Sequence, residues 1–153
     1  MSLSFDVITR LQGKTLATAE SCTGGMLGAA LTAVPGSSKV YKGGIISYTN
    51  EIKQKMLGVD AEVLKTNGAV SAQVARAMAE GARMALNSDI AVSVTGLAGP
   101  DGDEYGNFVG TVFIGYADVN TSFALKFRFF GSREEVRNQA CEEALEMILE
   151  LNP

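Results

Sequence analysis

Histidine does not occur among the 153 residues of this chain, and tryptophan is absent as well. Without histidine, the chain has no imidazole to act as a general base or as a metal ligand. It contains only two cysteines, Cys22 and Cys141, so we expect no structural zinc site, and nothing indicates another metal or a cofactor. Two cysteines far apart in sequence also favour a reducing compartment, and we expect a cytoplasmic protein.

The chain also lacks an excess of basic residues and any long hydrophobic run. Its formal net charge is −4 and it has no extended basic run, which argues against a nucleic-acid-binding surface. No apolar stretch approaches the roughly 18 residues needed to span a bilayer, so we expect no membrane association. The hydrophobic content of 46% is typical of a globular protein, and the length predicts one domain over residues 1–153.

Hydrophobic periodicity predicts an α/β fold. Helices are expected over residues 2–12, 26–33, 50–56, 60–67, 71–86 and from 133 onward. Strands are expected over residues 15–19, 40–48, 89–95, 110–117 and 122–130, with a bulge near Gly43 and Gly44. Asn50 is expected to cap its helix, and the last helix to turn Leu151 inward together with Val136, Ala140, Ala144 and Met147. This arrangement implies a three-layer α/β/α sandwich on a mixed sheet.

Three potential nucleophiles, Ser21, Cys22 and Thr23, follow the first expected strand and precede Gly24 and Gly25. A nucleophile on a strand-to-helix turn is exposed beside free backbone N–H groups, as acyl transfer requires. The alternative is a helix-capping turn in which a hydroxyl satisfies those N–H groups. A thiolate at Cys22 would indicate a cysteine hydrolase. Because side chains next to a nucleophile usually point away from it, we favour Cys22 as a small packed hydrophobe.

A neutral lysine amine is the best remaining base for a serine hydroxyl. Its ordinary pKa of about 10.4 must then be lowered by desolvation or by a neighbouring cation. Lys53 and Lys55 both lie near the start of an expected helix, whose N-terminus disfavours an ammonium group. Lys53 is the closer to the preceding strand, whereas Lys55 faces another side and suits a solvated surface position. The alternative for either residue is an ordinary surface charge.

A glycine-rich loop over residues 96–106 follows another expected strand. Ligands of α/β sheets bind outside the carboxyl ends of the strands, so this loop and the Ser21 turn are expected to face one cleft. Glycines there let backbone N–H groups approach an anion such as phosphate, although a flexible connection between strands is the alternative. Asp101, Asp103 and Glu104 suit either a divalent metal or a solvated loop. No nucleotide-triphosphate or dinucleotide fingerprint is present.

Six segments together resemble the CinA C-terminal domain family. They are TAESCTGG at 18–25, PGSS at 35–38, YTNEIK at 48–53, GAVS at 68–71, TGLAGPDG at 95–102 and VGTV at 109–112. The family is similar to nicotinamide-nucleotide amidases, which hydrolyse nicotinamide mononucleotide to nicotinate mononucleotide and ammonia in pyridine-nucleotide recycling. The resemblance implies a serine–lysine amidohydrolase with Ser21 and Lys53 as the catalytic pair. Many relatives carry an additional N-terminal domain. Because this sequence begins directly at the amidase-like domain, we expect the stand-alone form.

On this hypothesis Tyr48, or a hydroxyl such as that of Thr23, relays or orients protons beside the catalytic pair. The oxyanion and the substrate are expected to contact Cys22, Thr23, Gly24, Gly25, Asn50, Thr95, Gly96 and Gly99. The expected partner is a small nucleotide whose phosphate meets loop amides and either Arg133 or Arg137, and homo-oligomerisation is left open. The alternatives are a non-catalytic nucleotide-binding regulatory module that uses the same cleft, and an esterase or peptidase that uses the same serine and lysine.

Overall fold

The computed structural model describes residues 2–153, and its centre is a five-stranded mixed sheet with the order β2-β1-β3-β4-β5. The strands are β1 (Leu16–Glu20), β2 (Tyr41–Ile46), β3 (Ile90–Gly96), β4 (Thr111–Ala117) and β5 (Ser122–Arg128). Strand β1 pairs in parallel with β2 and β3, whereas β4 is antiparallel to β3 and β5. The predicted mixed sheet is therefore confirmed.

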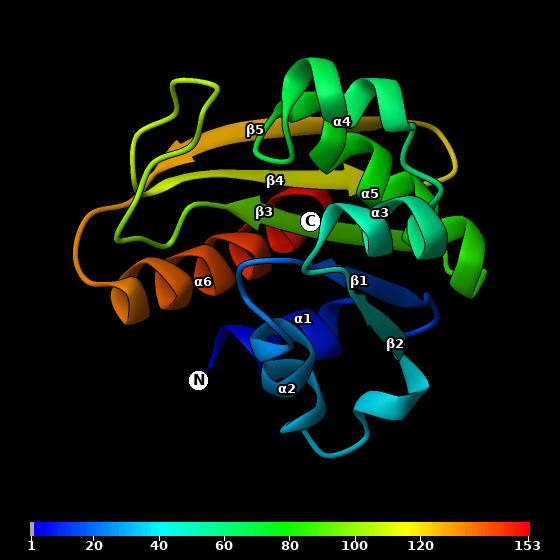
Figure 1. Cartoon of the computed structure of the whole chain (residues 1–153). Coiled ribbons are helices and arrows are strands. Elements are labelled where there is room, and N and C mark those ends of the chain that lie inside the picture. The colour runs from blue at the N-terminus through cyan, green and yellow to red at the C-terminus, as the bar shows by residue number, and fades with distance from the viewer. Residues whose placement is uncertain (1) are drawn as a thin grey trace.

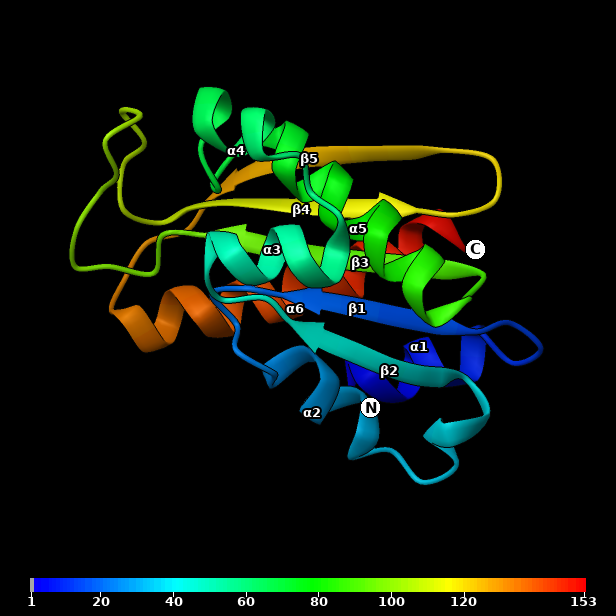
Figure 2. The same cartoon turned by 45° about the vertical axis from the view of Figure 1, so that its right-hand side comes forward.

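Helices cover both faces of this sheet (Figures 1 and 2). One face carries α1 (Leu3–Arg10), α2 (Met26–Thr32) and α6 (Arg133–Leu151), and the other carries α3 (Asn50–Leu57), α4 (Ala61–Asn67) and α5 (Ala72–Leu86). A 3-10 turn, η1 (Ser37–Lys39), leads into β2. The three-layer α/β/α sandwich expected from the sequence is confirmed.

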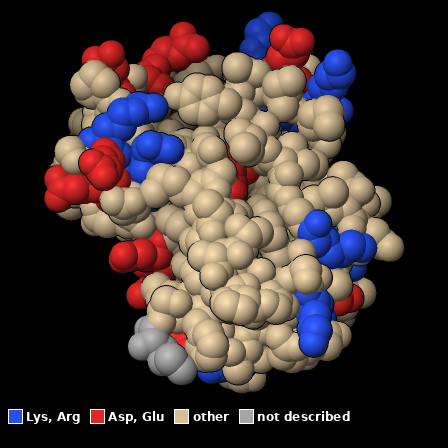
Figure 3. Space-filling view, turned by 90° about the horizontal axis from the view of Figure 1, so that it is seen from below, with Lys and Arg blue, Asp and Glu red and all other residues tan. Residues whose placement is uncertain are grey.

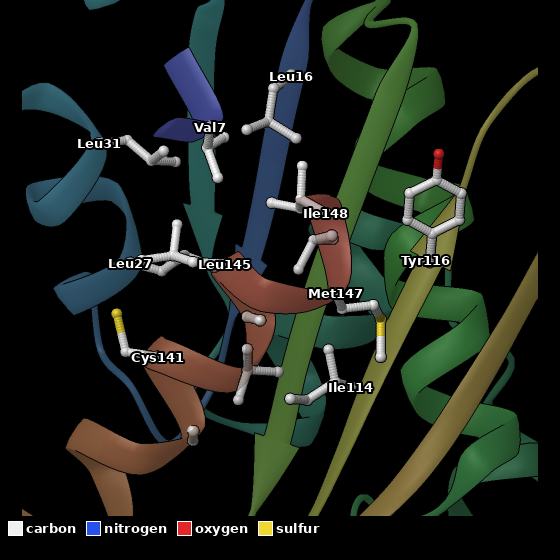
Figure 4. Packing of buried hydrophobic residues seen from close by; sticks show 14 of the residues in the cluster. Val7, Leu16, Leu27, Leu31, Ile114, Tyr116, Cys141, Leu145, Met147 and Ile148 are labelled. Atoms are coloured by element: carbon white, nitrogen blue, oxygen red, sulfur yellow. The ribbon is translucent and has the colours of Figure 1, made fainter. Parts of the chain in front are cut away.

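The larger of the two cores lies between the sheet and the layer formed by α1, α2 and α6 (Figure 4). There Leu16 of β1 and Ile114 of β4 pack with Ile148 of α6, and all three are almost completely buried. Strand β4 is buried along its whole length, whereas the edge strand β2 alternates between partly buried and exposed residues. The continuous apolar runs in the sequence thus mark central strands.

Local details differ from the sequence expectations at two places. The N-cap of α3 is Thr49, whose hydroxyl accepts a hydrogen bond from the Ile52 N–H, so the assignment of that cap to Asn50 is wrong. Leu151 is 39% exposed because the apolar stripe of α6 passes through the fully buried Ile148 instead. The predicted bulge is present, since the pairing of β1 with β2 skips Lys42, directly before the two glycines.

The parallel strands β1, β2 and β3 end at the same edge of the sheet, at the left in Figure 2. The residues that follow β1 and β2 are hydrogen-bonded to the adjacent strand. The Ser21 N–H, after β1, donates to the Val94 carbonyl of β3 (2.9 Å), and the Ser47 N–H, after β2, donates to the Glu20 carbonyl of β1 (2.7 Å). This edge therefore gathers the serine-containing turn, the segment before α3 and the glycine-rich loop.

Within residues 2–153, no helix is both long and apolar enough to cross a membrane. Figure 3 shows the molecule from below, where α2 lies in Figure 1. Uncharged residues form most of this face, and the Lys, Arg, Asp and Glu side chains gather toward its margins. Neither sign of charge dominates it.

Candidate active site

Ser21 is the first residue after β1 and is 7% exposed. The chain turns sharply after it, and the Gly24 N–H donates to the Ser21 carbonyl at 3.1 Å. Gly24 and Gly25 have φ angles of +56° and +107°, in the left-handed region that side chains with a Cβ rarely adopt. The two glycines are thus required by the turn that presents Ser21.

The carboxylate of Glu20 holds this turn from beneath. It is 2% exposed and accepts four hydrogen bonds, from the Thr23 hydroxyl and the N–H groups of Gly25, Leu27 and Gly28, at 2.7–3.1 Å. Three of these donors are backbone groups at the N-terminus of α2, which have no partner inside the helix. Negative charge is favourable at that position, so Glu20 fixes both the helix and the turn before it.

Lys53 lies in the first half of α3 with its ammonium group pointing at the serine. Its Nζ is 3.0 Å from the Ser21 Oγ, and the residue is only 1% exposed. It also donates to the carbonyl of Ser47 at 2.8 Å and to that of Tyr48 at 3.4 Å. The segment between β2 and α3 therefore leads into the helix that carries the lysine and also supplies the lysine's backbone acceptors.

Burial lowers the pKa of Lys53 from its ordinary value to about 8, against the smaller opposing effect of the nearby Cys22. The neutral amine is thus accessible near neutral pH. The two carbonyl oxygens around Nζ can only accept, so they take the two N–H groups of a neutral amine. Its lone pair is then left to face the third neighbour, the Ser21 hydroxyl. This geometry suits a lysine that removes a proton from serine.

Burial raises the pKa of the Cys22 thiol to about 11. The side chain is 6% exposed and belongs to the larger core, so it packs as a small hydrophobe and remains a thiol. The positive charges of Arg137 and Lys53 lower this pKa, but burial outweighs them, which leaves Ser21 as the activated group of the turn.

A cleft of about 360 Å³ opens in front of Ser21 and Lys53. One wall is formed by the Ser21 turn and the start of α3, and the other by the glycine-rich loop and Arg133. The residues that line it are Ser21, Cys22, Tyr48, Asn50, Lys53, Ala69, Val70, Thr95, Gly96, Leu97, Ala98, Gly99, Pro100, Asp101 and Arg133. The cleft therefore joins the two segments that the sequence placed at one edge of the sheet.

Arg133, the first residue of α6, bridges the two walls of the cleft. Its guanidinium donates to the Gly99 carbonyl at 2.6 Å and to the Tyr48 hydroxyl at 3.2 Å. Tyr48 is 59% exposed, so its ring stands at the mouth of the cleft. Arg137 does not line the cleft, and its guanidinium instead contacts the Ser21 turn.

Not all of the expected oxyanion and substrate contacts face the cleft. Cys22, Asn50, Thr95, Gly96 and Gly99 line it, whereas the side chain of Thr23 is turned to Glu20. The N–H groups of Gly24 and Gly25 already have acceptors, in the Ser21 carbonyl and the Glu20 carboxylate.

Two backbone N–H groups of the turn are free. Within residues 2–153, neither the Cys22 N–H nor the Thr23 N–H has an acceptor. Cys22 lines the cleft, whereas Thr23 is completely buried, so the Cys22 N–H is the turn's available donor for an oxyanion beside Ser21.

Sequence reasoning overlooked the segment between α4 and α5. The Thr95 hydroxyl donates to the Ala69 carbonyl at 2.9 Å and thereby holds residues 69–70 against the cleft. The Asn107 side chain donates to the Val70 carbonyl at 3.1 Å, which fastens the glycine-rich loop to the same segment. The block GAVS in the sequence was the only signal of this contribution.

One acidic residue of the loop, Asp103, has structural contacts of its own. Asp103 accepts from the N–H groups of Tyr105 and Asn107 and from the Asn107 side chain, so it shapes the loop. Across residues 2–153, no group of three or more histidine, cysteine or acidic side chains is arranged to hold a metal ion.

A hollow of similar size, about 390 Å³, lies between α5 and the β4–β5 turn, at the opposite edge of the sheet. Its serine, Ser122, contacts Arg76, whose Nε donates to the hydroxyl at 2.9 Å. An arginine stays protonated in proteins and cannot remove a serine proton. The cleft at Ser21 is therefore the better candidate for an active site.

Comparison with known proteins agrees with the resemblance drawn from the motifs. The family model described as CinA C-terminal domain matches residues 2–152. A CinA-like protein of Citrifermentans bemidjiense is 49% identical over 142 residues, which are 93% of this chain and 34% of that protein. A CinA-like protein of Geobacter sulfurreducens is 46% identical over 139 residues, 91% of this chain and 34% of that protein. The chain thus spans about a third of the length of these curated relatives.

Solved structures show the same fold. A competence-damaged protein (CinA) superfamily protein from Escherichia coli aligns with a TM-score of 0.95 and 36% identity, covering 97% of this chain and 88% of that one. A competence/damage inducible protein from Agrobacterium tumefaciens aligns with a TM-score of 0.94 and 41% identity, covering 99% and 94%. With the family model matching almost every residue, the chain belongs to the CinA C-terminal domain family.

Proposed function

We propose that this chain is an amidohydrolase that converts nicotinamide mononucleotide to nicotinate mononucleotide and ammonia through an acyl-enzyme on Ser21. The observation that carries the proposal is the 3.0 Å contact between the Ser21 Oγ and the buried Lys53 Nζ at the floor of a cleft. The choice of this amide follows from the resemblance of the family to nicotinamide-nucleotide amidases.

In the first half of the reaction, neutral Lys53 takes the proton of the Ser21 hydroxyl while Oγ attacks the carboxamide carbon. The Cys22 N–H donates to the oxygen that becomes negative, and such a donor contributes about 3–4 kcal/mol to the transition state. The tetrahedral intermediate collapses, the carbon–nitrogen bond breaks, and Lys53 returns its proton to the departing amine. Ammonia leaves, and Ser21 remains as an ester of nicotinate mononucleotide.

In the second half, water replaces ammonia. Lys53, again neutral, takes a proton from the water that attacks the ester carbon, and then returns it to the Ser21 Oγ as the ester bond breaks. The free acid leaves as nicotinate mononucleotide. No co-reactant other than water is needed, and the enzyme ends in its starting protonation state.

The substrate phosphate is assigned to the wall opposite Ser21. Arg133 lines the cleft, and the backbone of the glycine-rich loop around Gly99 lies next to it. A guanidinium group matches a phosphate in both charge and geometry. Tyr48, which contacts Arg133, is assigned to orienting the bound substrate at the mouth of the cleft.

The buried lysine also bears on the alternative of a non-catalytic nucleotide-binding module. A module that only binds gains nothing from a lysine whose charge is desolvated, because burial destabilises the ammonium form. A base for Ser21 needs that environment. Catalysis at Ser21 therefore explains why Lys53 is buried despite the cost in folding free energy, whereas nucleotide binding alone does not.

The test measures ammonia release from nicotinamide mononucleotide beside calorimetric binding of the same compound. We expect Ser21→Ala and Lys53→Ala each to lower turnover by at least about 10³-fold while the Ser21→Ala variant still binds the nucleotide. Lys55→Ala, in the same helix, is the matched control and should keep wild-type turnover. Binding without ammonia release by the wild type would instead support the regulatory module, and full activity of Ser21→Ala would contradict the mechanism.

A further inference from the structure

Arg137 lies on α6 one turn beyond Arg133, and it contacts the Ser21 turn from behind. Its Nε donates to the Cys22 carbonyl at 2.9 Å, and its Nη2 donates to the Thr23 carbonyl at 3.3 Å. It does not line the cleft, so it cannot touch a substrate bound there. Both of its acceptors are backbone groups of the turn that presents Ser21.

The first of these contacts sets the direction of a free donor. The Cys22 carbonyl and the Thr23 N–H belong to one planar trans peptide unit, in which the two groups point in opposite directions. Because Arg137 holds the carbonyl on the side of α6, the Thr23 N–H is directed to the opposite side. That N–H has no acceptor within residues 2–153, but Thr23 is completely buried, so this contact fixes the turn without presenting the Thr23 N–H to the cleft.

The second contact acts on the other free donor through one intermediate step. The Thr23 carbonyl shares its peptide unit with the Gly24 N–H, which donates to the Ser21 carbonyl at 3.1 Å. The Ser21 carbonyl in turn shares its peptide unit with the Cys22 N–H, the second donor without an acceptor. One guanidinium group therefore fixes the peptide units that carry both free N–H groups.

We propose that Arg137 is a positioning residue that aims and polarises the Cys22 N–H, the oxyanion donor of the Ser21 turn. This inference rests on the proposed acyl transfer at Ser21. A permanent positive charge at the carbonyl end of a peptide unit draws electron density toward that end and strengthens the N–H at the other as a donor. The oxyanion thus gains from the charge of Arg137 across the peptide backbone, without contact.

Lysine cannot replace arginine in this role. The guanidinium presents Nε and Nη2 in a rigid plane, which allows two carbonyls of consecutive residues to be held together. The single ammonium of a lysine keeps the charge but loses the fork. Arg137→Lys therefore separates the geometric contribution from the electrostatic one, and Arg137→Gln removes the charge as well.

The kinetic test compares the acylation rate with substrate binding. We expect Arg137→Gln to lower kcat by about 10–100-fold, in the range for weakening oxyanion donors, with KM changed by less than about threefold. Arg137→Lys should retain part of the lost rate. The pH midpoint set by Lys53 should stay near its wild-type value. Arg83→Gln is the matched control, since the Arg83 Nε also donates to a backbone carbonyl, that of Asp89, at the far edge of the sheet.

A chromogenic ester separates this inference from the choice of substrate. The burst of p-nitrophenolate from p-nitrophenyl acetate reports acylation of Ser21, whatever amide the enzyme uses. If wild type shows the burst, Ser21→Ala lacks it and Arg137→Gln slows it at least tenfold, the inference stands even when nicotinamide mononucleotide is not turned over. Restoration of the Arg137→Ala burst by millimolar guanidinium would support positioning over a general loss of structure.

Three results would overturn the inference. One is an Arg137→Gln variant that is acylated at the wild-type rate, and another is a loss confined to KM. The third is the absence of any Ser21-dependent release of p-nitrophenolate by the wild type, because then Ser21 performs no acyl transfer for Arg137 to assist.

Discussion

The two walls of the cleft are built in opposite ways. The wall that carries Ser21 is a short turn held by the buried Glu20, which accepts four hydrogen bonds, and by the partly buried Arg137, which donates two. The opposite wall is the long loop between β3 and β4, much of it exposed, and fastened to the α4–α5 region by Tyr105 and Asn107.

This difference separates two tasks. Reacting groups need geometry fixed within a fraction of an ångström, and the many buried hydrogen bonds around Ser21 supply it. Contacts with the rest of a substrate tolerate more variation and are commonly carried by loops on a rigid scaffold. We therefore expect changes in the Ser21 wall to affect stability and turnover, and changes in the loop wall to affect binding.

The largest effect is expected from Glu20→Ala. It removes the common acceptor of the Thr23 hydroxyl and three N–H groups at the start of α2. Leaving these donors unsatisfied should lower the free energy of unfolding by about 3–5 kcal/mol and abolish turnover. Chemical denaturation followed by circular dichroism measures the first, and ammonia release the second.

The matched control for this change is Glu62→Ala, at an exposed position in the first turn of α4. Its unfolding free energy should stay within about 0.5 kcal/mol of wild type. Equal effects of the two substitutions would remove the distinction between a buried anchor and an ordinary helix-terminal charge.

Lys53→Met should give an inactive protein that is more stable than wild type. At pH 7 the folded wild type carries an ammonium in a buried site, whereas methionine fills similar volume without a charge, so we expect a gain of roughly 1–3 kcal/mol. The folded pKa of about 8 lies below the ordinary value of 10.5, so folding disfavours the proton. Wild-type stability should rise relative to the variant between these two pH values.

Thermal and chemical unfolding of both proteins at pH 7 and pH 10 tests this prediction. The stability gap should be wider at pH 7. A gap that stays constant over this range would show that the lysine is not desolvated in the folded protein.

The pH dependence of kcat/KM follows the titration of the same Lys53 proton. Burial lowers stability by disfavouring the ammonium form, but it favours the neutral amine that acts as the base. Because the neutral amine of Lys53 is the proposed base, kcat/KM should rise about tenfold per pH unit below its pKa and level off above about 8. A profile of kcat/KM from pH 6 to 10 with nicotinamide mononucleotide measures this. A rising limb centred near the ordinary lysine value would contradict the role of burial.

Much of the scaffold could be predicted from the sequence because its patterns are local. The apolar run of residues 89–95 is typical of a central strand, and the structure confirms this strand as β3. The helices expected from residues 71 and 133 begin there as well, with Ser71 and Ser132 as their N-caps. The cap of α3 was missed because Thr49 and Asn50 are adjacent residues that both favour this position.

The candidate site was less accessible to the same reasoning. A strand-to-helix turn predicted Ser21, but the choice of Lys53 over Lys55 needed the family resemblance. The contacts of Ser47, Val70 and Arg137 with the site run through backbone carbonyls or lie far away in sequence. Such contacts leave no pattern of residue types, so only the folded chain reveals them.

The smallest effect is expected in the loop wall, from Asn107→Ala. The substitution removes the amide that donates to Val70 at 3.1 Å and to Asp103 at 2.8 Å, and so loosens the loop from the α4–α5 segment. Because these contacts are near the surface, the unfolding free energy should change by no more than about 1 kcal/mol. We expect KM to rise about three- to tenfold and kcat to stay within about twofold, since a looser loop lowers the fraction of molecules ready to bind.

Steady-state kinetics of Asn107→Ala against Asn120→Ala tests this division between the walls. Asn120 lies in the exposed β4–β5 turn at the far edge of the sheet, so its substitution should change neither constant. If Asn107→Ala instead lowered kcat and left KM unchanged, the loop would be holding reacting groups. The two walls would then share the chemistry, and the contrast between a rigid catalytic wall and an adjustable binding wall would be wrong.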